Sequence, residues 1–228
     1  MAGVLKAKDL RKTYPSGAGL VAAVDGVNIS IRPGDYLVIM GVSGSGKTTL
    51  LSLLSGLERP TSGSVTVDEL DLTKLSERAL TALRQSRFGF IFQDFHLIGH
   101  LTALENVAVP LELAGKSGAV ARQRALELLN RQGLGDRTHH FPHQLSGGQK
   151  QRVAVCRALA NRPSVIFADE PTGNLDRASA DAVLGLFDEL HQEGQTMVVV
   201  THDPAVADRG DRVIRMEAGR IVSGERRA

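Results

Sequence analysis

Cysteine, excess charge of one sign and long apolar runs are all scarce in this chain of 228 residues. The single cysteine, Cys156, cannot form an internal disulfide and leaves no cysteine cluster for zinc, which fits a reducing compartment. The longest apolar runs, such as 37–40 and 197–200, are far shorter than the roughly 18 residues of a membrane-spanning helix. The 27 basic and 25 acidic side chains nearly cancel, which does not suggest a surface for nucleic acid. Because no signal-peptide pattern opens the chain, we expect a cytoplasmic protein.

Glycine, in contrast, is plentiful and unevenly placed. The chain has 24 glycines, and two clusters stand out at 41–46 and 147–148. The rest of the composition, with 42% hydrophobic and 23% charged residues, is that of an ordinary packed globular protein. We expect the two glycine clusters to carry the function.

The hydrophobic pattern predicts an α/β fold. Short β-branched runs alternate with helical periods, which is typical of a mostly parallel sheet flanked by helices. From about 102 to 160 no strand signal occurs, and 119–132 and 149–160 are strong helix formers, so a helical subdomain interrupts the sheet. A further helix is predicted over 178–193. The predicted strands are 4–10, 27–31, 36–40, 64–67, 88–92, 165–168, 197–201, 212–216 and 220–222.

The sequence GVSGSGKT at 41–48 has the spacing of a phosphate-binding P-loop. A strand is predicted to end at Met40 and a helix to run over 47–54, which is the context that this motif requires. The glycines let successive N–H groups point inward, and the helix N-terminus adds the positive end of its dipole. We expect Lys47 to reach the β- and γ-phosphates and the Thr48 hydroxyl to bind Mg²⁺, which favours a nucleoside triphosphate with its metal. The residues expected to bind the nucleotide here are Gly41, Ser43, Gly44, Ser45, Gly46, Lys47, Thr48 and Thr49.

Two carboxylates follow the predicted buried strand at 165–168. Asp169 and Glu170 stand at its carboxyl end, where ligands bind in open α/β sheets. We expect Asp169 to hold Mg²⁺ through its water shell and Glu170 to polarise the water that attacks the γ-phosphate. By itself such a pair is also typical of an exposed turn, and the P-loop elsewhere in the chain favours the catalytic interpretation.

A second glycine-rich helix start lies at 145–149, with the sequence LSGGQ. Ser146 is a natural N-cap, and the helix N-terminus that follows it can bind phosphate. Two anion sites roughly a hundred residues apart could serve one nucleotide from opposite sides, or two nucleotides in a symmetric dimer. The spacing does not choose between these arrangements.

Taken together, these motifs resemble those of the ATP-binding subunits of ATP-binding cassette (ABC) transporters. The likeness covers about 4–222 and rests on GVSGSGKT, Gln93, LSGGQ, FADEPTGNLD and THD. It implies a P-loop NTPase core with an N-terminal antiparallel β portion and an inserted α-helical subdomain. The implied division is a single domain over 1–228, with the core at about 1–92 and 161–228 and the helical subdomain at about 93–160.

The resemblance also implies how the two anion sites are used. In the family two subunits pair head to tail around ATP, so the signature residues of one subunit contact the γ-phosphate held by the P-loop of the other. Asp176 matches the aspartate that links the two sites. The signature residues are Ser146, Gly147, Gly148 and Gln149.

Three further residues take roles from the same resemblance. Gln93 matches the switch glutamine that senses Mg²⁺ and the membrane partner, and His202 matches the switch histidine that reaches the γ-phosphate. Tyr14 matches the aromatic residue that stacks on adenine. The implied catalytic residues are Glu170, His202 and Gln93, and the implied metal ligands are Thr48, Gln93 and Asp169.

Segments 89–93, 101–107 and 171–176 resemble the lipoprotein-release and macrolide-export branch, which is related to antimicrobial-peptide exporters and the cell-division ATPase. The branch implies a cytoplasmic motor on the inner face of the cell membrane. Its partner would be a separate permease with few membrane helices and a large extracytoplasmic domain. The implied assembly is a homodimer with ATP and Mg²⁺, although related motors can be heterodimers. The apolar residues Phe95, Leu97, Ile98 and Leu101 could receive a coupling helix of the permease or be ordinary core.

Two other functions are weighed against transport. The same ATP cycle could regulate a cell-wall hydrolase during division, and only the partner would distinguish this function. An ABC-type nucleic-acid repair or translation ATPase is disfavoured, because 47–145 leaves no room for coiled-coil arms and no basic tail is present. The cluster His139, His140 and His143 lacks the carboxylates of a typical metal site.

Overall fold

The computed structural model describes residues 4–17 and 19–226 of the chain. These residues pack as two units, one made of the part up to 81 together with the part from 190 onward, and one made of 82–189. The ends of the predicted domain, 1–3 and 227–228, and residue 18 lie outside the described residues. The units divide the chain at other points than the predicted subdomains, whose bounds stay a prediction.

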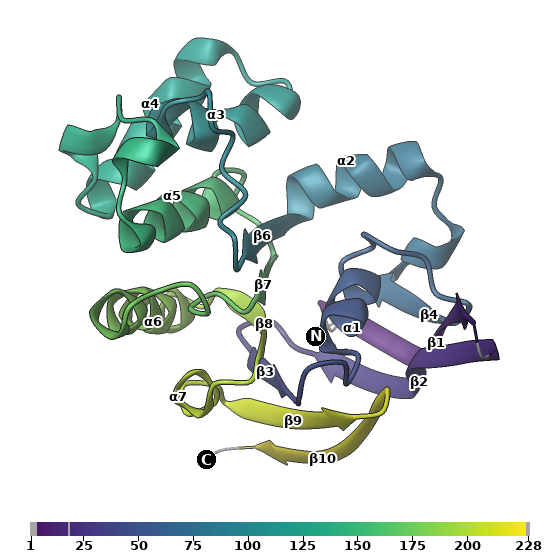
Figure 1. Cartoon of the computed structure of the whole chain (residues 1–228). Helices are drawn as coiled ribbons and strands as arrows, with labels where there is room; N and C mark the ends of the chain where they lie inside the picture. The colour runs from purple at the N-terminus through teal and green to yellow at the C-terminus, as the bar shows by residue number, and fades with distance from the viewer. Residues whose placement is uncertain (1–3, 18, 227–228) are drawn as a thin grey trace. The chain divides into compact units, whose positions relative to one another are not determined.

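The first unit contains an antiparallel sheet built on a long hairpin (Figure 1). β1 (Leu5–Ser16) pairs with both β2 (Gly19–Ile31) and β4 (Ser62–Val67), and the short β5 (Leu70–Asp71) pairs with β4. The sequence predicted only the inner part of this hairpin, at 4–10 and 27–31. β1 shifts register three times against β2, and Asp9 has a φ of 46°. Such bulges interrupt the alternation of apolar and polar residues by which a strand is recognised in a sequence. The outer part of the hairpin therefore had no clear strand pattern.

A second set of strands in the same unit, in the order β10-β9-β3-β8, is mainly parallel. β3 (Tyr36–Met40) pairs in parallel with β8 (Thr196–Thr201) and β9 (Arg212–Glu217), whereas β10 (Arg220–Arg226) is antiparallel to β9. β3 and β8 are buried along their whole length, as expected for parallel strands covered on both faces. α1 (Lys47–Leu54) follows β3, and α7 (Pro204–Ala207) follows β8.

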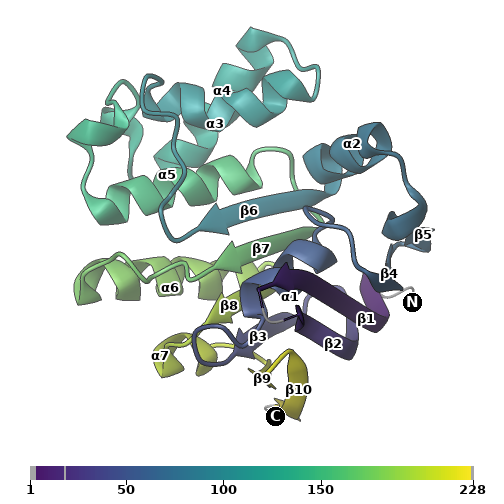
Figure 2. The same ribbon diagram turned by 45° about the vertical axis from the view of Figure 1, so that its right-hand side comes forward.

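The second unit is mostly helical. β6 (Phe88–Phe92) and β7 (Val165–Asp169) pair in parallel in it, and Figure 2 shows α5 running alongside β6. Three α-helices separate the two strands in the sequence: α3 (Ala103–Leu113), α4 (Gly118–Arg131) and α5 (Gly147–Leu159). α6 (Arg177–Gln192) follows β7.

The helices predicted at 119–132, 149–160 and 178–193 are confirmed to within two residues at each end. α2 (Glu77–Arg87), which the pattern did not predict, begins in the first unit and ends in the second. None of the helices that the structure describes has the length and apolar character that crossing a bilayer requires.

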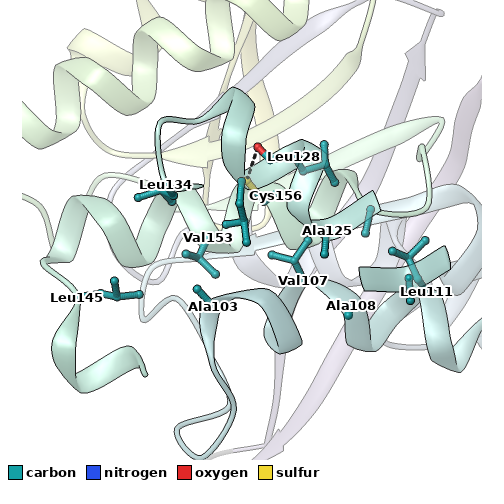
Figure 3. Packing of buried hydrophobic residues seen from close by; sticks show 13 residues of the cluster. Ala103, Val107, Ala108, Leu111, Ala125, Leu128, Leu134, Leu145, Val153 and Cys156 are labelled. Atoms are coloured by element: carbon teal, nitrogen blue, oxygen red, sulfur yellow. Dashed lines mark hydrogen bonds between the residues drawn. The ribbon is translucent and has the colours of Figure 1, made fainter. Parts of the chain in front are cut away.

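The helical part of the second unit consists of α3, α4 and α5, and an apolar cluster that these three helices share holds it together (Figure 3). Small residues such as Ala103, Ala121 and Ala125 are fully buried in it, which lets the helix axes approach closely. Cys156 of α5 is also fully buried, and its thiol donates to the carbonyl oxygen of Leu128 at 3.5 Å. Burial raises the pKa of the Cys156 thiol to about 12.

Cys156 should therefore resist thiol reagents while the chain is folded. Because the thiolate is the reactive form, we expect negligible alkylation by iodoacetamide at mildly alkaline pH and full alkylation in urea. Mass spectrometry of the intact chain measures both. Stoichiometric labelling of the folded chain at the rate seen in urea would contradict the burial of this cysteine.

Gly89 of β6 is required by the close packing of this strand on α5. A Cβ at Gly89 would lie 2.5 Å from the carbonyl oxygen of Ala158, a backbone atom that cannot easily move. We expect Gly89→Ala to lower the free energy of unfolding by about 1–3 kcal/mol. Gly185→Ala in α6 is the matched control, since a Cβ there meets no atom within 4 Å, and it should raise stability by up to about 1 kcal/mol. Urea denaturation measures both, and equal midpoints for the two variants would disprove the contact.

Candidate functional site

The P-loop of the first unit leaves β3 after Met40 and enters α1 at Lys47. Gly44 has a φ of 78° and Gly46 a φ of 98°, a left-handed backbone that side chains disfavour. Lys47 is buried, and its ammonium group donates to the carbonyl oxygens of Gly41 at 2.8 Å and Val42 at 3.1 Å. The lysine therefore folds back onto its own loop and places a buried positive charge there.

Neighbouring backbone leaves no space for side chains at the two ends of the P-loop. A Cβ at Gly41 would lie 2.5 Å from the carbonyl oxygen of Met216 in β9. One at Gly46 would overlap the carbonyl oxygen of Ala23 in β2. The loop is thus seated between strands of both sheets of the first unit, and only glycine fits at these two positions.

Ser45 of the P-loop carries a buried hydroxyl that has no hydrogen-bond partner among the described residues. Its carbonyl oxygen accepts from the Gly219 N–H at 3.0 Å, so the backbone is anchored while the side chain is not satisfied. A buried polar group left unpaired costs about 1–3 kcal/mol. A phosphate oxygen would accept this proton, and together with the Lys47 charge and the glycine backbone the hydroxyl fits a bound phosphate group.

Tyr14, which the sequence predicts to stack on adenine, lies half-buried near the end of β1. Its hydroxyl donates to Glu58 Oε2 at 2.6 Å, and the Lys12 ammonium lies 5.2 Å from the ring centroid. Lys12 and Glu58 also form an ion pair at 2.8 Å. Burial raises the pKa of Tyr14, and the hydrogen bond to Glu58 raises it further. The ring is therefore neutral and held in one place.

His202 and the P-loop emerge from the same edge of the first unit's parallel strands. Met40, the last residue of β3, is the register partner of Thr201, the last residue of β8. Parallel strands present their carboxyl ends together, and this is the edge at which α/β proteins bind ligands. The structure thus brings the predicted switch histidine to the edge that carries the P-loop.

The second unit repeats this arrangement with other residues. Phe92 of β6 pairs with Asp169 of β7, so Gln93 and Glu170, the next residues, leave their strands at one edge. Glu170 has a φ of 45°, a left-handed conformation that costs a residue with a side chain about 1–3 kcal/mol. Strain of this kind clusters at functional sites.

The turn after Glu170 is hydrogen-bonded to α5, the helix that begins at the LSGGQ segment. The Gly173 N–H donates to the Glu170 carbonyl oxygen at 3.0 Å, which closes the turn. Gln151 of α5 is fully buried, and its Nε2 donates to the carbonyl oxygen of Pro171. The backbone at Glu170 is therefore held both by its own turn and by α5.

The LSGGQ segment forms the N-terminus of α5 with a capping box. Ser146 Oγ accepts from the Gln149 N–H at 3.3 Å, and the Ser146 N–H donates to Gln149 Oε1 at 3.0 Å. The Ser146 hydroxyl keeps its own proton to donate to an anion. The side-chain oxygen of Gln149, in contrast, serves the cap itself.

Asp176 lies beside the signature segment. A Cβ at Gly148 would lie 2.7 Å from the Ser179 hydroxyl, which itself donates to Asp176 Oδ2 at 2.8 Å. The Ser179 N–H donates to Asp176 Oδ1 at 2.9 Å, and these two bonds lower the pKa of Asp176. The aspartate is therefore a helix cap for α6 that adjoins a signature glycine.

Two polar side chains, one from α5 and one from α3, form hydrogen bonds with the loop that follows Gln93. Arg157 of α5 donates to the carbonyl oxygens of Phe95, at 2.7 Å, and of His96. Asn106 of α3 is fully buried, accepts from the Ile98 N–H at 2.7 Å and donates to the Ile98 carbonyl oxygen at 3.1 Å. Ile98 itself is 37% exposed, whereas Leu97 packs on the apolar cluster of the helical part.

Each unit therefore gathers its own group of predicted residues. The first holds the P-loop, Tyr14 and His202, and the second holds Gln93, Asp169, Glu170, Asp176 and the signature segment. Sequence reasoning missed several residues that position these groups, among them Glu58, Arg157 and Gln151. Glu58 had no local signal, whereas Arg157 could have been noticed as a cation in an otherwise apolar part of α5.

The chain is similar to known proteins over nearly its whole length. A family model described as ABC transporter matches residues 24–173. The macrolide export ATP-binding/permease protein MacB 1/2 of Paracoccus denitrificans (strain Pd 1222) is 48% identical over 225 residues, 99% of this chain and 34% of that protein. An uncharacterized ABC transporter ATP-binding protein of Thermotoga maritima is 47% identical over 227 residues, 100% of this chain and 97% of that protein. The chain thus spans about a third of the length of the MacB relative.

Two solved structures have a similar fold. The dimeric structure of a post-hydrolysis state of the ATP-binding cassette MJ0796 bound to ADP and Pi is 43% identical, with a TM-score of 0.90. The match covers 97% of this chain and 98% of the MJ0796 chain. A second dimeric structure of MJ0796, described as a bacterial ABC transporter cassette, is 44% identical with a TM-score of 0.90 over the same shares.

The fixed ring of Tyr14 leads to a prediction about nucleotide binding. Tyr14→Ala removes the ring, and we expect ATP affinity to fall about tenfold, because stacking of a base contributes about 1–3 kcal/mol. Tyr14→Phe keeps the ring and loses only the bond to Glu58, so its affinity should stay within about twofold of the parent. Titration with a fluorescent ATP analogue measures both variants. Unchanged affinity in Tyr14→Ala would remove this residue from the site.

Proposed function

The chain belongs to the ABC transporter family, and on this premise we propose that it is the ATP-hydrolysing subunit that drives a membrane permease. The main support is the presence of two glycine-containing helix N-termini, at α1 and at α5, in one chain. Each is a helix start of the kind that binds a phosphate group. We infer that the two act on one nucleotide from different subunits.

ATP with Mg²⁺ would supply the phosphoanhydride bond that is broken and the charge that polarises it. The buried Lys47 charge and the Ser45 hydroxyl would bind its phosphates. Thr48, Asp169 and Gln93 offer hydroxyl, carboxylate and amide oxygens, which are the donor types that Mg²⁺ prefers.

Glu170 would act as the general base of the hydrolysis. Its carboxylate would hold the attacking water and accept its proton, as a base positioned within hydrogen-bond reach does. The left-handed backbone of Glu170 supports this role, because a costly conformation persists where function requires it. His202, at the sheet edge of the P-loop, would donate to the γ-phosphate oxygens.

The active assembly would be a head-to-tail homodimer. In it, the Ser146 hydroxyl and the N–H groups of Gly147 and Gly148 would donate to the γ-phosphate held on the other subunit's P-loop. The free proton of Ser146 in the capping box supports this arrangement. The similar MJ0796 structures are dimeric, and one of them is bound to ADP and Pi.

The permease would hold this motor at the inner face of the cell membrane. The MacB relatives combine ATP-binding and permease parts under one name, which supports a permease of the macrolide-export or lipoprotein-release type. Its cargo would be a lipoprotein, a macrolide or a peptide. The partly exposed Ile98, in the loop after Gln93, would receive the coupling helix.

Glu170→Gln tests this function directly. The amide cannot accept the proton of water, so we expect the turnover of ATP to fall by at least about a hundredfold while ATP binding is retained. The variant should accumulate as an ATP-bound dimer, which light scattering after size-exclusion chromatography detects. Glu189→Gln, an exposed glutamate of α6, is the control and should hydrolyse ATP like the parent. Normal turnover in Glu170→Gln would show that this assignment is wrong.

Ser146→Arg separates the two anion sites in the same experiment. A bulky cation at the signature helix should prevent the dimer without weakening ATP binding by the monomer. If the monomer lost ATP binding instead, the signature would belong to the same subunit's nucleotide, and the head-to-tail arrangement would fail.

A further inference from the structure

The side-chain amide of Gln93 is held by the side-chain amide of Asn174. Gln93 Nε2 donates to Asn174 Oδ1 at 3.2 Å, and Asn174 Nδ2 donates to the Gln93 carbonyl oxygen at 3.3 Å. Asn174 Nδ2 also donates to Asp94 Oδ1 at 2.7 Å. All three residues belong to the second unit, in the segments that follow β6 and β7. None of the sequence motifs assigned a role to Asn174 or Asp94.

The Asp94 carboxylate determines which way both amides point. The oxygen and nitrogen of an amide have nearly the same shape, so their hydrogen-bond partners decide the orientation. A carboxylate only accepts, and therefore the nitrogen of Asn174 faces Asp94 while its oxygen faces Gln93. That oxygen also only accepts, so the nitrogen of Gln93 faces it. Gln93 Oε1 is consequently turned away from Asn174, and it makes no hydrogen bond to any residue that the structure describes.

Gly173 closes a second side of the Gln93 amide. A Cβ at Gly173 would lie 2.9 Å from Gln93 Nε2 and 3.1 Å from Gln93 Cδ. Any side chain at this position would push the amide off Asn174. The absence of a Cβ at Gly173 therefore lets the Gln93 amide reach Asn174, and the amide pair decides which end faces it.

We propose that Asn174 and Asp94 are positioning residues that present Gln93 Oε1, rather than the NH₂ group, to a divalent cation. This role presupposes the ATPase function proposed above. An amide oxygen is a ligand that Mg²⁺ accepts, whereas an amide NH₂ group only donates and cannot bind a cation. An amide that rotates freely presents either end. Loss of the orientation therefore weakens cation binding and leaves phosphate binding by the P-loop unchanged.

Two variants disturb the orientation in different ways. Asn174→Leu removes the partner of Gln93 and frees its amide. Asp94→Lys replaces an acceptor with a donor, so the Asn174 amide turns over and its nitrogen captures Gln93 Oε1. The pair Asp94→Lys with Asn174→Asp restores the orientation, because a carboxylate at 174 accepts from both neighbours. Glu189→Lys on α6 is the control for the change of charge.

The first measurement is the Mg²⁺ concentration that gives half-maximal ATP hydrolysis at saturating ATP. We expect it to rise about two- to tenfold in both disturbing variants, the range that one hydrogen bond provides, and to return to the parent value in the double variant. Affinity for ATP without metal should stay unchanged in all of them. If Asn174 and Asp94 had a purely structural role, their single substitutions would lower the stability of the chain. The double variant, which exchanges donor and acceptor, would then not restore the Mg²⁺ requirement of the parent.

The second measurement is the NMR signal of the Gln93 side-chain NH₂ group in the ligand-free chain, identified by its loss in Gln93→Glu. In the parent and the double variant, we expect this group to exchange slowly with water, and in Asn174→Leu to exchange quickly. Equal exchange rates in all variants, or an unchanged Mg²⁺ requirement in both disturbing variants, would overturn the inference. A parent chain without Mg²⁺-dependent ATP hydrolysis would refute the proposed function, and the NMR result would still decide the orientation of Gln93.

Discussion

Parallel pairing of β3 with β8, and of β6 with β7, is the constraint on which the rest of this protein depends. Parallel strands end at the same edge, so the segments that follow them leave the sheet side by side. In the first unit this places His202 beside the start of the P-loop, although the two are far apart in the sequence. In the second unit it places Gln93 beside Glu170. The backbone thus brings the predicted functional residues to these two edges.

The turns at these edges use two kinds of unusual backbone. Gly46 has a positive φ and lies against a neighbouring strand, and only a residue without a Cβ fits there. Glu170 also has a positive φ, yet its side chain is the one that the proposed chemistry needs. Its strain has to be offset by surrounding contacts, such as the bond from the buried Gln151 to the turn that follows Glu170. Glycine therefore fits where neighbouring backbone leaves no space for a Cβ, and hydrogen bonds to the following turn hold the strained backbone of Glu170.

Polar side chains hold the loop after β6, in addition to the packing of Leu97 on the apolar cluster. Asn174, Arg157 and Asn106 bond to this loop from the segment after β7, from α5 and from α3. Apolar contacts are non-directional and fix only position, whereas hydrogen bonds also fix orientation. A loop that presents one end of an amide to a cation therefore requires hydrogen bonds. The same loop carries the partly exposed Ile98, the residue proposed above to receive the coupling helix.

The sequence by itself determined the features that depend on neighbouring residues. The strands at 36–40 and 88–92, the helix at 47–54 and the Ser146 cap follow from local spacing and local hydrogen bonds, and the structure has them where they were predicted. Only the tertiary structure decided the outer part of the first hairpin, because bulges in β1 interrupt the alternation of apolar and polar residues there. It also decided that Tyr14 bonds to a residue 44 positions away, and Gln93 to one 81 positions away. Partners so distant leave no local pattern, because the fold alone brings them within hydrogen-bond distance.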